Sequence, residues 1–203
     1  MLDSYARKPF DKLFDRSADI LLALRLRPNH VTGAALAVGL GAGIALYTEH
    51  PVFATGLLWF SGFLDAVDGS MARRTGKASL RGAMFDVVSD RLVELAIFWA
   101  LALRHPGSLY SMMGLLSAVL ISMTVFLTTG MLAQKSGPKS FYYQAGLMER
   151  SEGFIASTAM MLFQQWLIPL TWVYAALIGV TICQRLLEAF RILKSESNDK
   201  ENP

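Results

Sequence analysis

The chain has 203 residues, of which 53% are hydrophobic and only 17% are charged, and its formal net charge is +3. A soluble domain usually carries about 25% charged residues, so this composition disfavours a soluble protein and indicates a membrane protein. The single cysteine, Cys183, excludes an intrachain disulfide and a cysteine-ligated zinc site. The length suffices for one domain of about six spans of about 20 residues each.

The first segment, residues 1–27, is predicted to form an amphipathic helix. Apolar residues alternate at helical spacing with the basic residues Arg7, Lys8, Lys12 and Arg16. A helix of this kind lies in the plane of a membrane interface. Packing on the protein itself as a solvated helix explains the pattern about as well. The segment lacks the continuous apolar core that a cleavable signal peptide needs, so we expect none.

The next part, residues 28–190, is predicted to form a bundle of six membrane-spanning helices. The spans are expected near residues 30–47, 52–72, 82–103, 109–132, 154–167 and 171–187. The last residues, 195–203, are polar and lack apolar side chains, and we expect them to be disordered. Residues 1–194 therefore form a single all-α integral membrane domain.

Lysine and arginine are distributed asymmetrically around these spans. All of the 19 basic residues except Arg91 and Arg104 lie before the first span, after the second or fourth span, or near the C-terminal end. Cytoplasmic segments of membrane proteins carry the excess of Lys and Arg. The distribution therefore predicts that both termini face the cytoplasm.

Glycines recur in the first span at positions 33, 39, 41 and 43. Small residues in membrane helices allow neighbouring helices to approach closely, so we predict a packing role. A nucleotide-binding Gly-x-Gly loop is rejected, because no strand precedes these glycines.

Four carboxylates lie in or beside the second and third spans: Asp65, Asp68, Asp86 and Asp90. Members of each pair are three or four residues apart, so each pair lies on one helix face. If residues 74–81 form a turn, the two pairs face each other at equal depth. Carboxylate oxygens are hard ligands that suit Mg²⁺ or Mn²⁺. A charge within a membrane is costly and usually marks a functional site.

Metal ions held at a membrane edge are natural partners for a diphosphate group. The small residues Gly69, Ala72 and Gly82 leave room for a ligand near the backbone, and Arg73 supplies a cation for a phosphate. A carboxylate not committed to metal could deprotonate an attacking hydroxyl. Two alternatives remain open: structural carboxylates paired with neighbouring arginines, and a cation transporter with an intramembrane carboxylate site.

The third span also carries Arg91 and Glu94, which are three residues apart. This spacing places both side chains on one helix face. We predict that they pair with each other rather than act directly in catalysis. Pairing of Arg91 with another nearby carboxylate is the alternative.

The pattern Asp-x2-Asp-Gly-x2-Ala-Arg-x8-Gly-x3-Asp-x3-Asp resembles the signature of the CDP-alcohol phosphotransferase family. Every fixed position is matched, by Asp65, Asp68, Gly69, Ala72, Arg73, Gly82, Asp86 and Asp90. The Pro-Asn-x2-Thr opening of the first span, with Asn29 and Thr32, also looks like the family's. The resemblance implies six spans, a cytoplasmic interfacial helix at the N-terminus and a homodimer.

The resemblance also implies a reaction and its residues. A CDP-linked lipid, usually CDP-diacylglycerol, loses CMP when an alcohol hydroxyl attacks, at the cytoplasmic side of a bacterial or archaeal cell membrane. Two Mg²⁺ or Mn²⁺ ions would be bound by the four carboxylates, with Asp90 sharing in metal binding or acting as general base. No nucleic-acid partner is expected. The implied CDP-binding residues are Asn29, Thr32, Asp65, Asp68, Gly69, Ala72, Arg73 and Gly82.

Three further cations indicate the acceptor. Lys135, Arg150 and Arg185 are similar in placement to the acceptor-phosphate cations of bacterial phosphatidylinositol-phosphate synthases. The sequence of residues 146–150 fits that pattern, whereas residues 135–143 depart from it. The similarity implies a phosphorylated acceptor, inositol phosphate or glycerol 3-phosphate. An unphosphorylated acceptor such as serine or inositol is the alternative.

Overall fold

The structure is a computed structural model that describes residues 2–76, 79–132 and 146–201, with side chains described from residue 11 to residue 193. Within these ranges it contains helices and turns and no strand, which confirms the all-α prediction. Two short 3₁₀ helices, η1 (Pro106–Ser108) and η3 (Gln164–Trp166), lie at turns. The α-helices are α1 (Leu2–Ala23), α2 (Pro28–Tyr47), α3 (Pro51–Thr75), α4 (Leu80–Arg104), α5 (Leu109–Leu132), α6 (Arg150–Leu162) and α7 (Leu167–Glu201).

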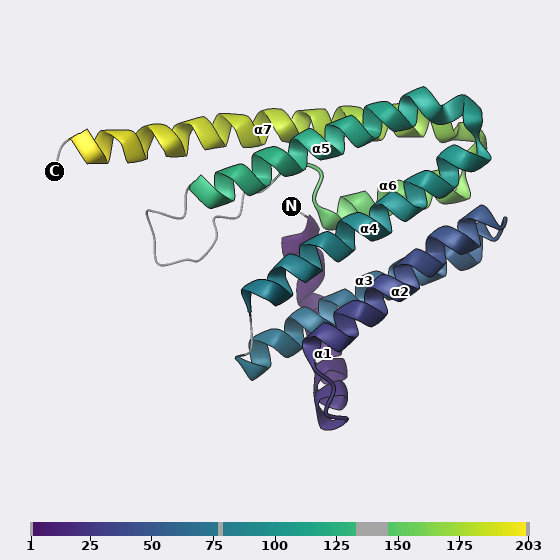
Figure 1. The fold of residues 1–203 in the computed structure, drawn as a ribbon, viewed down its shortest axis with the longest axis horizontal. Helices are drawn as coiled ribbons and strands as arrows, with labels where there is room; N and C mark the ends of the chain where they lie inside the picture. Colours follow the sequence, from purple (N-terminus) through teal and green to yellow (C-terminus); the bar gives the residue numbers. More distant parts are fainter. Residues whose placement is uncertain (1, 77–78, 133–145, 202–203) are drawn as a thin grey trace.

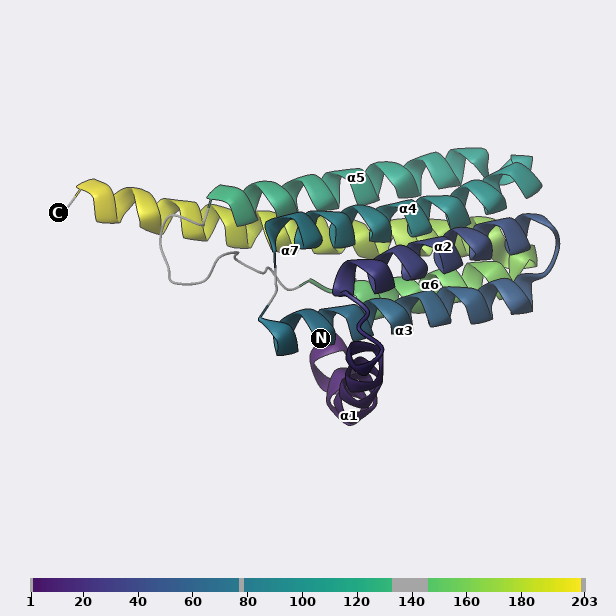
Figure 2. The same cartoon turned by 60° about the horizontal axis from the view of Figure 1, so that its bottom comes forward.

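Helices α2 to α7 run along a common direction and form a bundle, and α1 lies across it beside α3 (Figure 1). Figure 2 shows the α2–α3, α4–α5 and α6–α7 turns at one end of the bundle. The C-terminal end of α3, the start of α4 and the end of α7 lie at the other end. The basic residues Arg73, Arg74 and Arg81 therefore lie at the same end as the C-terminus.

Three helical segments of the described chain are long and apolar enough to cross a membrane: Pro28–Tyr47, Pro106–Leu132 and Gln164–Leu193. Helices α3 and α4 carry the acidic and basic residues of the motif, and α6 has only 13 residues. Large apolar side chains are nevertheless exposed around the bundle, among them Val52, Phe53, Trp99 and Trp172. An apolar exterior of this kind suits a lipid environment.

Helices α6 and α7 differ in extent from the predicted fifth and sixth spans. Helix α6 ends at Leu162 and not near residue 167, because the chain turns into η3, where the Gln164 amide donates to the Met161 carbonyl at 2.9 Å. Helix α7 continues to Glu201, beyond the predicted end of the sixth span at residue 187 and past the start of the polar tail at residue 195. Extending an existing helix avoids the cost of nucleating a new one, which favours this continuation.

Helices α2 and α4 touch at two glycines. A Cβ atom on Gly39 would lie 2.3 Å from Cγ2 of Val93, and one on Gly43 would lie 2.9 Å from Cβ of Ala96. Both separations are shorter than real Cβ atoms tolerate, so the close approach of the two helices requires glycine there. The predicted packing role is confirmed at these two positions. Around Gly33 there is open space.

Gly43→Ala should therefore lower the thermal unfolding midpoint of the protein in detergent micelles. The added methyl meets backbone atoms of α4 that cannot rotate away, and overpacking of this kind costs about 1–3 kcal/mol. Gly33→Ala is the matched control, since alanine favours a helix by up to about 1 kcal/mol over glycine and has room there. Equal shifts for the two variants would contradict this packing argument.

Helix α1 is attached to the motif helix α3 by apolar and polar contacts. A small core forms from Ala18 of α1, Val67 and Met71 of α3, and Val31 of α2. The Ser70 hydroxyl donates to Oδ1 of Asp15 at 2.6 Å, and Arg74 donates to Oδ1 of Asp19 at 2.5 Å. Helix α1 also carries the exposed apolar side chains of Leu13 and Ile20, and the exposed Leu24 follows directly after it.

Candidate active site

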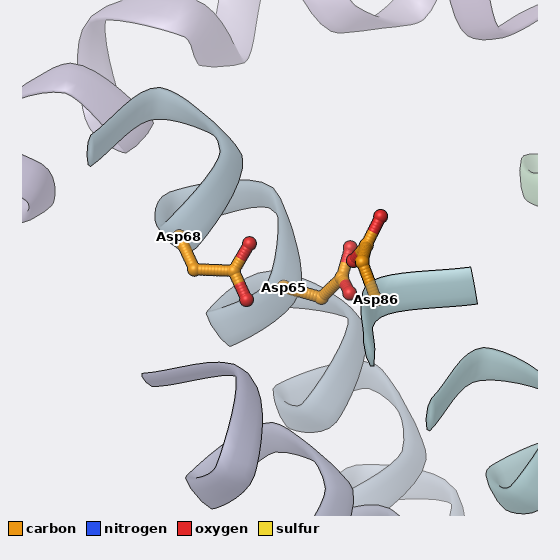
Figure 3. A group of neighbouring side chains, drawn as sticks. All are labelled: Asp65, Asp68 and Asp86. Carbon is orange, nitrogen blue, oxygen red and sulfur yellow. The ribbon is translucent and has the colours of Figure 1, made fainter. Parts of the chain in front are cut away.

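Three carboxylates from two helices meet near one end of the bundle. Asp65 and Asp68 project from α3 and Asp86 projects from α4 (Figure 3). One carboxylate oxygen of each residue lies within 4.8 Å of the others. Asp65 and Asp68 are buried. The helical spacing in the sequence therefore predicted correctly that acids of the second and third spans face each other.

Two local features end α3 and start α4 on either side of this cluster. Gly76 has a φ of +60° at the end of α3, a left-handed conformation that glycine adopts without strain. At the start of α4 the Ser79 hydroxyl accepts a hydrogen bond from the backbone N–H of Gly82 at 3.0 Å. This is an N-cap, which satisfies a free backbone donor of the first turn.

The carboxylate cluster fits a divalent cation. Oδ2 of Asp68 is buried and has no hydrogen-bond partner among the residues that the structure describes. Burying such an oxygen without a partner is unfavourable, and a cation would compensate for it. Thr32 of α2 is a neighbour of the same carboxylate, and its hydroxyl donates to the Pro28 carbonyl at 3.2 Å. Three oxygen donors match the ligand preference of Mg²⁺ and Mn²⁺.

The fourth predicted ligand, Asp90, lies beside this cluster and not in it. Nη2 of Arg150 donates to Oδ1 of Asp90 at 2.8 Å, and Nη1 of Arg150 pairs with Oδ2 of Asp65. Arg150 is the first residue of α6, so one guanidinium joins α3, α4 and α6. Charge-assisted contacts of this kind are among the stronger hydrogen bonds in proteins.

The residues expected to bind CDP surround the same end of α3 and α4. A Cβ atom on Gly82 would lie 3.3 Å from Oδ1 of Asn29, so Asn29 faces the start of α4. A Cβ atom on Gly69 would lie 3.4 Å from Nη1 of Arg73, whose guanidinium thus covers this glycine. Ala72 is half-buried and Arg73 is exposed. Gly69, Ala72 and Gly82 thus form a surface of small residues next to the carboxylates, and Arg73 supplies one cation beside it.

A cavity of about 340 Å³ opens beside Asp65 and Asp90. Two of the three predicted acceptor cations, Arg150 and Arg185, line it. Arg185 is buried, donates to the Ser122 hydroxyl at 3.0 Å and lies 4.9 Å from the centre of the Phe126 ring. The third, Lys135, lies outside the described residues. The structure thus brings two cations from α6 and α7 into one cavity with Asp90.

The position of Arg150 depends on how the chain before α6 is fixed to α7. The backbone N–H of Leu147 donates to Oε1 of Gln184, and that of Met148 donates to the Thr181 hydroxyl, both at 2.9 Å. A Cβ atom on Gly146 would lie 2.4 Å from Cγ2 of Thr181. Only glycine permits this approach, which determines where α6 begins.

The cavity also has lining residues that the sequence interpretation did not single out. Ser89, Glu149 and Tyr174 are buried along it. Ser89 immediately precedes Asp90, and Glu149 immediately precedes Arg150. Their position next to residues of the predicted site is the feature of the sequence that could have indicated them. Tyr174 is 80 residues away from Glu94 in the chain but its hydroxyl lies 3.5 Å from Oε1 of Glu94. No local pattern indicates such a contact.

The predicted pairing of Arg91 with Glu94 is confirmed. Nη1 of Arg91 donates to Oε2 of Glu94 within α4. Both side chains line the cavity, deeper in the bundle than Asp90. The charges of this pair balance, so the deeper part of the cavity carries no excess charge.

The chain is similar in sequence and fold to known phosphatidylinositol phosphate synthases. Phosphatidylinositol phosphate synthase of Corynebacterium glutamicum is 27% identical over 197 residues, which cover 93% of this chain and 89% of that protein. A solved structure of Mycobacterium tuberculosis phosphatidylinositol phosphate synthase, with CDP-DAG bound, is similar in fold, with a TM-score of 0.69 and 22% identity over 88% of this chain and 94% of that one.

A second structure of the M. tuberculosis protein, in complex with manganese and citrate, has a TM-score of 0.68 at 22% identity, over 87% of this chain and 88% of that one. Residues 25–182 match the CDP-alcohol phosphatidyltransferase family, most of the chain and all of the carboxylate motif. The apolar helices agree with an integral membrane protein. This chain therefore belongs to the CDP-alcohol phosphatidyltransferase family and is a transferase of phospholipid synthesis.

Proposed function

We propose that this enzyme transfers the phosphatidyl group of CDP-diacylglycerol to a phosphorylated alcohol, inositol phosphate or glycerol 3-phosphate, and releases CMP. The observation that supports this acceptor class is the cavity in which Arg150 and Arg185 lie near Asp90. Two fixed guanidinium groups suit an acceptor that carries a phosphate as well as the attacking hydroxyl. The name of the C. glutamicum relative is in agreement.

In this proposal Asp65, Asp68, Asp86 and Asp90 hold two ions, Mg²⁺ or Mn²⁺. The chemistry that such ions supply is neutralisation of the diphosphate and stabilisation of charge on the departing CMP. The manganese complex of the M. tuberculosis protein supports this choice of metals. The nucleotide is bound by Asp65 and Asp68 together with Asn29, Thr32, Gly69, Ala72, Arg73 and Gly82.

Asp90 is the proposed proton acceptor of the reaction. Its carboxylate borders both the three-acid cluster and the cavity, so it lies between the two proposed substrates. It takes the proton of the attacking hydroxyl as the new bond to phosphorus forms. Arg150 and Arg185 hold the phosphate of the acceptor and so orient that hydroxyl toward the phosphorus.

We also propose how the chain lies in the membrane. Helices α2 to α7 provide six spans, and the basic clusters place both termini and the site on the cytoplasmic side. Helix α1 lies in the interface with its exposed Leu13 and Ile20, and with Leu24 just after it, toward the lipid. A homodimer in the cell membrane of a bacterium or archaeon is proposed from the family resemblance.

Two other functions make different use of the same residues. An unphosphorylated acceptor, such as serine or inositol, would leave the charges of Arg150 and Arg185 without a substrate group to bind. A cation transporter would more naturally place its acids near the middle of broken helices. Here the acids lie on continuous helices, near the end where α3 stops and α4 begins.

The acceptor class is tested by measuring CMP release from labelled CDP-diacylglycerol with Mg²⁺ or Mn²⁺. Inositol phosphate, glycerol 3-phosphate, inositol and serine are compared as acceptors for the purified protein in detergent. We expect kcat/KM to be at least about 100-fold higher with a phosphorylated acceptor, because only a phosphate can accept charge-assisted hydrogen bonds from Arg150 and Arg185. Release of CMP with serine or free inositol alone would overturn the proposed acceptor.

A further inference from the structure

Helix α1 is joined to the motif helix α3 by a hydrogen bond to a carboxylate. The Ser70 hydroxyl donates to Oδ1 of Asp15 at 2.6 Å, where Ser70 is buried and Asp15 is half-buried. Hydrogen bonds to an ionised acceptor are shorter and stronger than those between neutral groups. Ser70 follows Gly69 directly and lies two residues after Asp68. The bond therefore fixes the part of α3 that carries the motif.

The contacts with α1 lie on the opposite face of α3 from the motif residues. An α-helix turns by about 100° per residue, so Ser70 and Arg74 lie about 140° and 180° around α3 from Asp65. Asp68 and Arg73 lie within about 80° of Asp65 on the same scale. Helix α1 thus contacts α3 behind the proposed nucleotide site, where it can set the orientation of α3 without touching the substrate.

Two consecutive arginines at the end of α3 point in different directions. Arg74 donates to the backbone carbonyl of Asp15 at 2.8 Å and pairs with Asp19, so its side chain is directed toward α1. Nη1 of Arg73 would lie 3.4 Å from a Cβ atom on Gly69, so its side chain is directed along the motif face. The rotation of α3 about its own axis decides which of the two guanidinium groups faces the site.

We propose that Asp15 of α1 is a positioning residue for the nucleotide end of α3. Its hydrogen bond to Ser70 sets the rotation of α3 so that Arg73, and not Arg74, faces the diphosphate of CDP-diacylglycerol. The inference rests on the proposed function, because it takes the nucleotide to lie against Gly69 and Arg73. The proposed acceptor cations belong to α6 and α7. Asp15 should therefore affect binding of the nucleotide lipid and leave binding of the acceptor unchanged.

Asp15→Ala should raise two constants by about tenfold, since misplacing a positioned group by about 1 Å can cost up to about 100-fold. They are the KM for CDP-diacylglycerol, from CMP release, and the Kd for CDP with Mn²⁺ present, from calorimetry. The KM for the acceptor should stay the same. Ser70→Ala should have the same effect, and the double variant should bind no more weakly than either, because both changes remove one bond. Asp15→Asn, which keeps an accepting oxygen, should restore most of the affinity.

Asp19→Ala is the matched control. Asp19 lies one helical turn further along α1 and also pairs with a residue of α3, but its side chain is 61% exposed. Exposed ion pairs contribute little to the position of either partner. Arg74 would still donate to the backbone carbonyl of Asp15. This variant should leave the KM for CDP-diacylglycerol and the Kd for CDP unchanged.

The thermal unfolding midpoint separates positioning from folding. If Asp15→Ala lowers the midpoint but leaves the KM for CDP-diacylglycerol and the Kd for CDP unchanged, the role is only structural and the proposal is wrong. An equal effect of Asp19→Ala would overturn it as well. If the unaltered enzyme releases CMP only with unphosphorylated acceptors, the proposed acceptor class fails, and weaker CDP binding by Asp15→Ala still supports the positioning role. If the unaltered protein does not bind CDP, the positioning role fails together with the nucleotide site.

Discussion

Replacing Asp90 by asparagine should abolish most CMP release while CDP-diacylglycerol still binds. Asparagine has nearly the same shape but cannot accept the proton of the attacking hydroxyl, and loss of a general base costs about 10²- to 10⁴-fold in kcat. Arg150 retains its ion pair with Asp65, so α6 should stay in place. The measurements are kcat with saturating acceptor and the dissociation constant of CDP-diacylglycerol from calorimetry.

The same variant separates two roles of Asp90. In the structure Asp90 lies outside the group of three carboxylates that approach within 4.8 Å of one another. Mn²⁺ affinity, followed by electron paramagnetic resonance, should therefore fall less in Asp90→Asn than in a variant of the three-acid cluster. Asp19→Asn is the control, because this acid on α1 pairs with Arg74 and faces solvent. Normal turnover in Asp90→Asn would exclude it as the base.

Asp68→Asn should weaken Mn²⁺ binding by at least about 100-fold. Even residues that only support a metal ligand cost about 10- to 100-fold when they are lost, and a ligand should cost no less. With the metal removed by a chelator, the variant should be as stable as the unaltered protein or more so. The reason is that Oδ2 of Asp68 is buried without a hydrogen-bond partner in the described chain, and the substitution removes its charge.

Thermal unfolding with and without Mn²⁺ measures both effects. At 100 times the dissociation constant, a bound ion adds about 2.7 kcal/mol to the free energy of unfolding. The unaltered protein should show this gain, and Asp68→Asn should show almost none at the same Mn²⁺ concentration. A variant that gains as much from Mn²⁺ as the unaltered protein does would show that Asp68 is not a ligand.

The contact of Arg150 with both Asp65 and Asp90 links the three-acid cluster to the cavity. Asp65 belongs to the three-acid cluster and Asp90 borders the cavity, so the same guanidinium touches both. Arg150 is about one-third exposed, and the contribution of such a pair to folding is correspondingly modest. Its position depends on the Gly146–Met148 segment and its hydrogen bonds to α7.

Much of the helical pattern was predictable from the sequence because it is local. The spans expected near residues 30–47, 52–72, 82–103 and 109–132 lie within α2, α3, α4 and α5, since runs of apolar residues, prolines and polar turns act within one segment. Helical spacing also placed Asp65 and Asp68 on one face of α3.

The three-acid cluster was predictable for a similar reason. A short connection between two helices makes them antiparallel neighbours, so acids at equal distances from it meet. The approach of α2 to α4 could be expected from Gly39 and Gly43 in the same way, although the partners Val93 and Ala96 could not be named.

Only the tertiary structure decided how Arg150 and Arg185, which the resemblance had named as acceptor cations, lie relative to Asp90. Arg150, Arg185 and Tyr174 come from α6 and α7, far along the chain from Asp90, and no periodicity within one segment relates them. Their positions follow from packing between helices and from hydrogen bonds such as Met148 to Thr181, which are individually weak and nonlocal. The sequence by itself therefore determined the helices, the acidic motif and the family. The cavity and the bridging of Asp65 and Asp90 by Arg150 arise from how those helices pack.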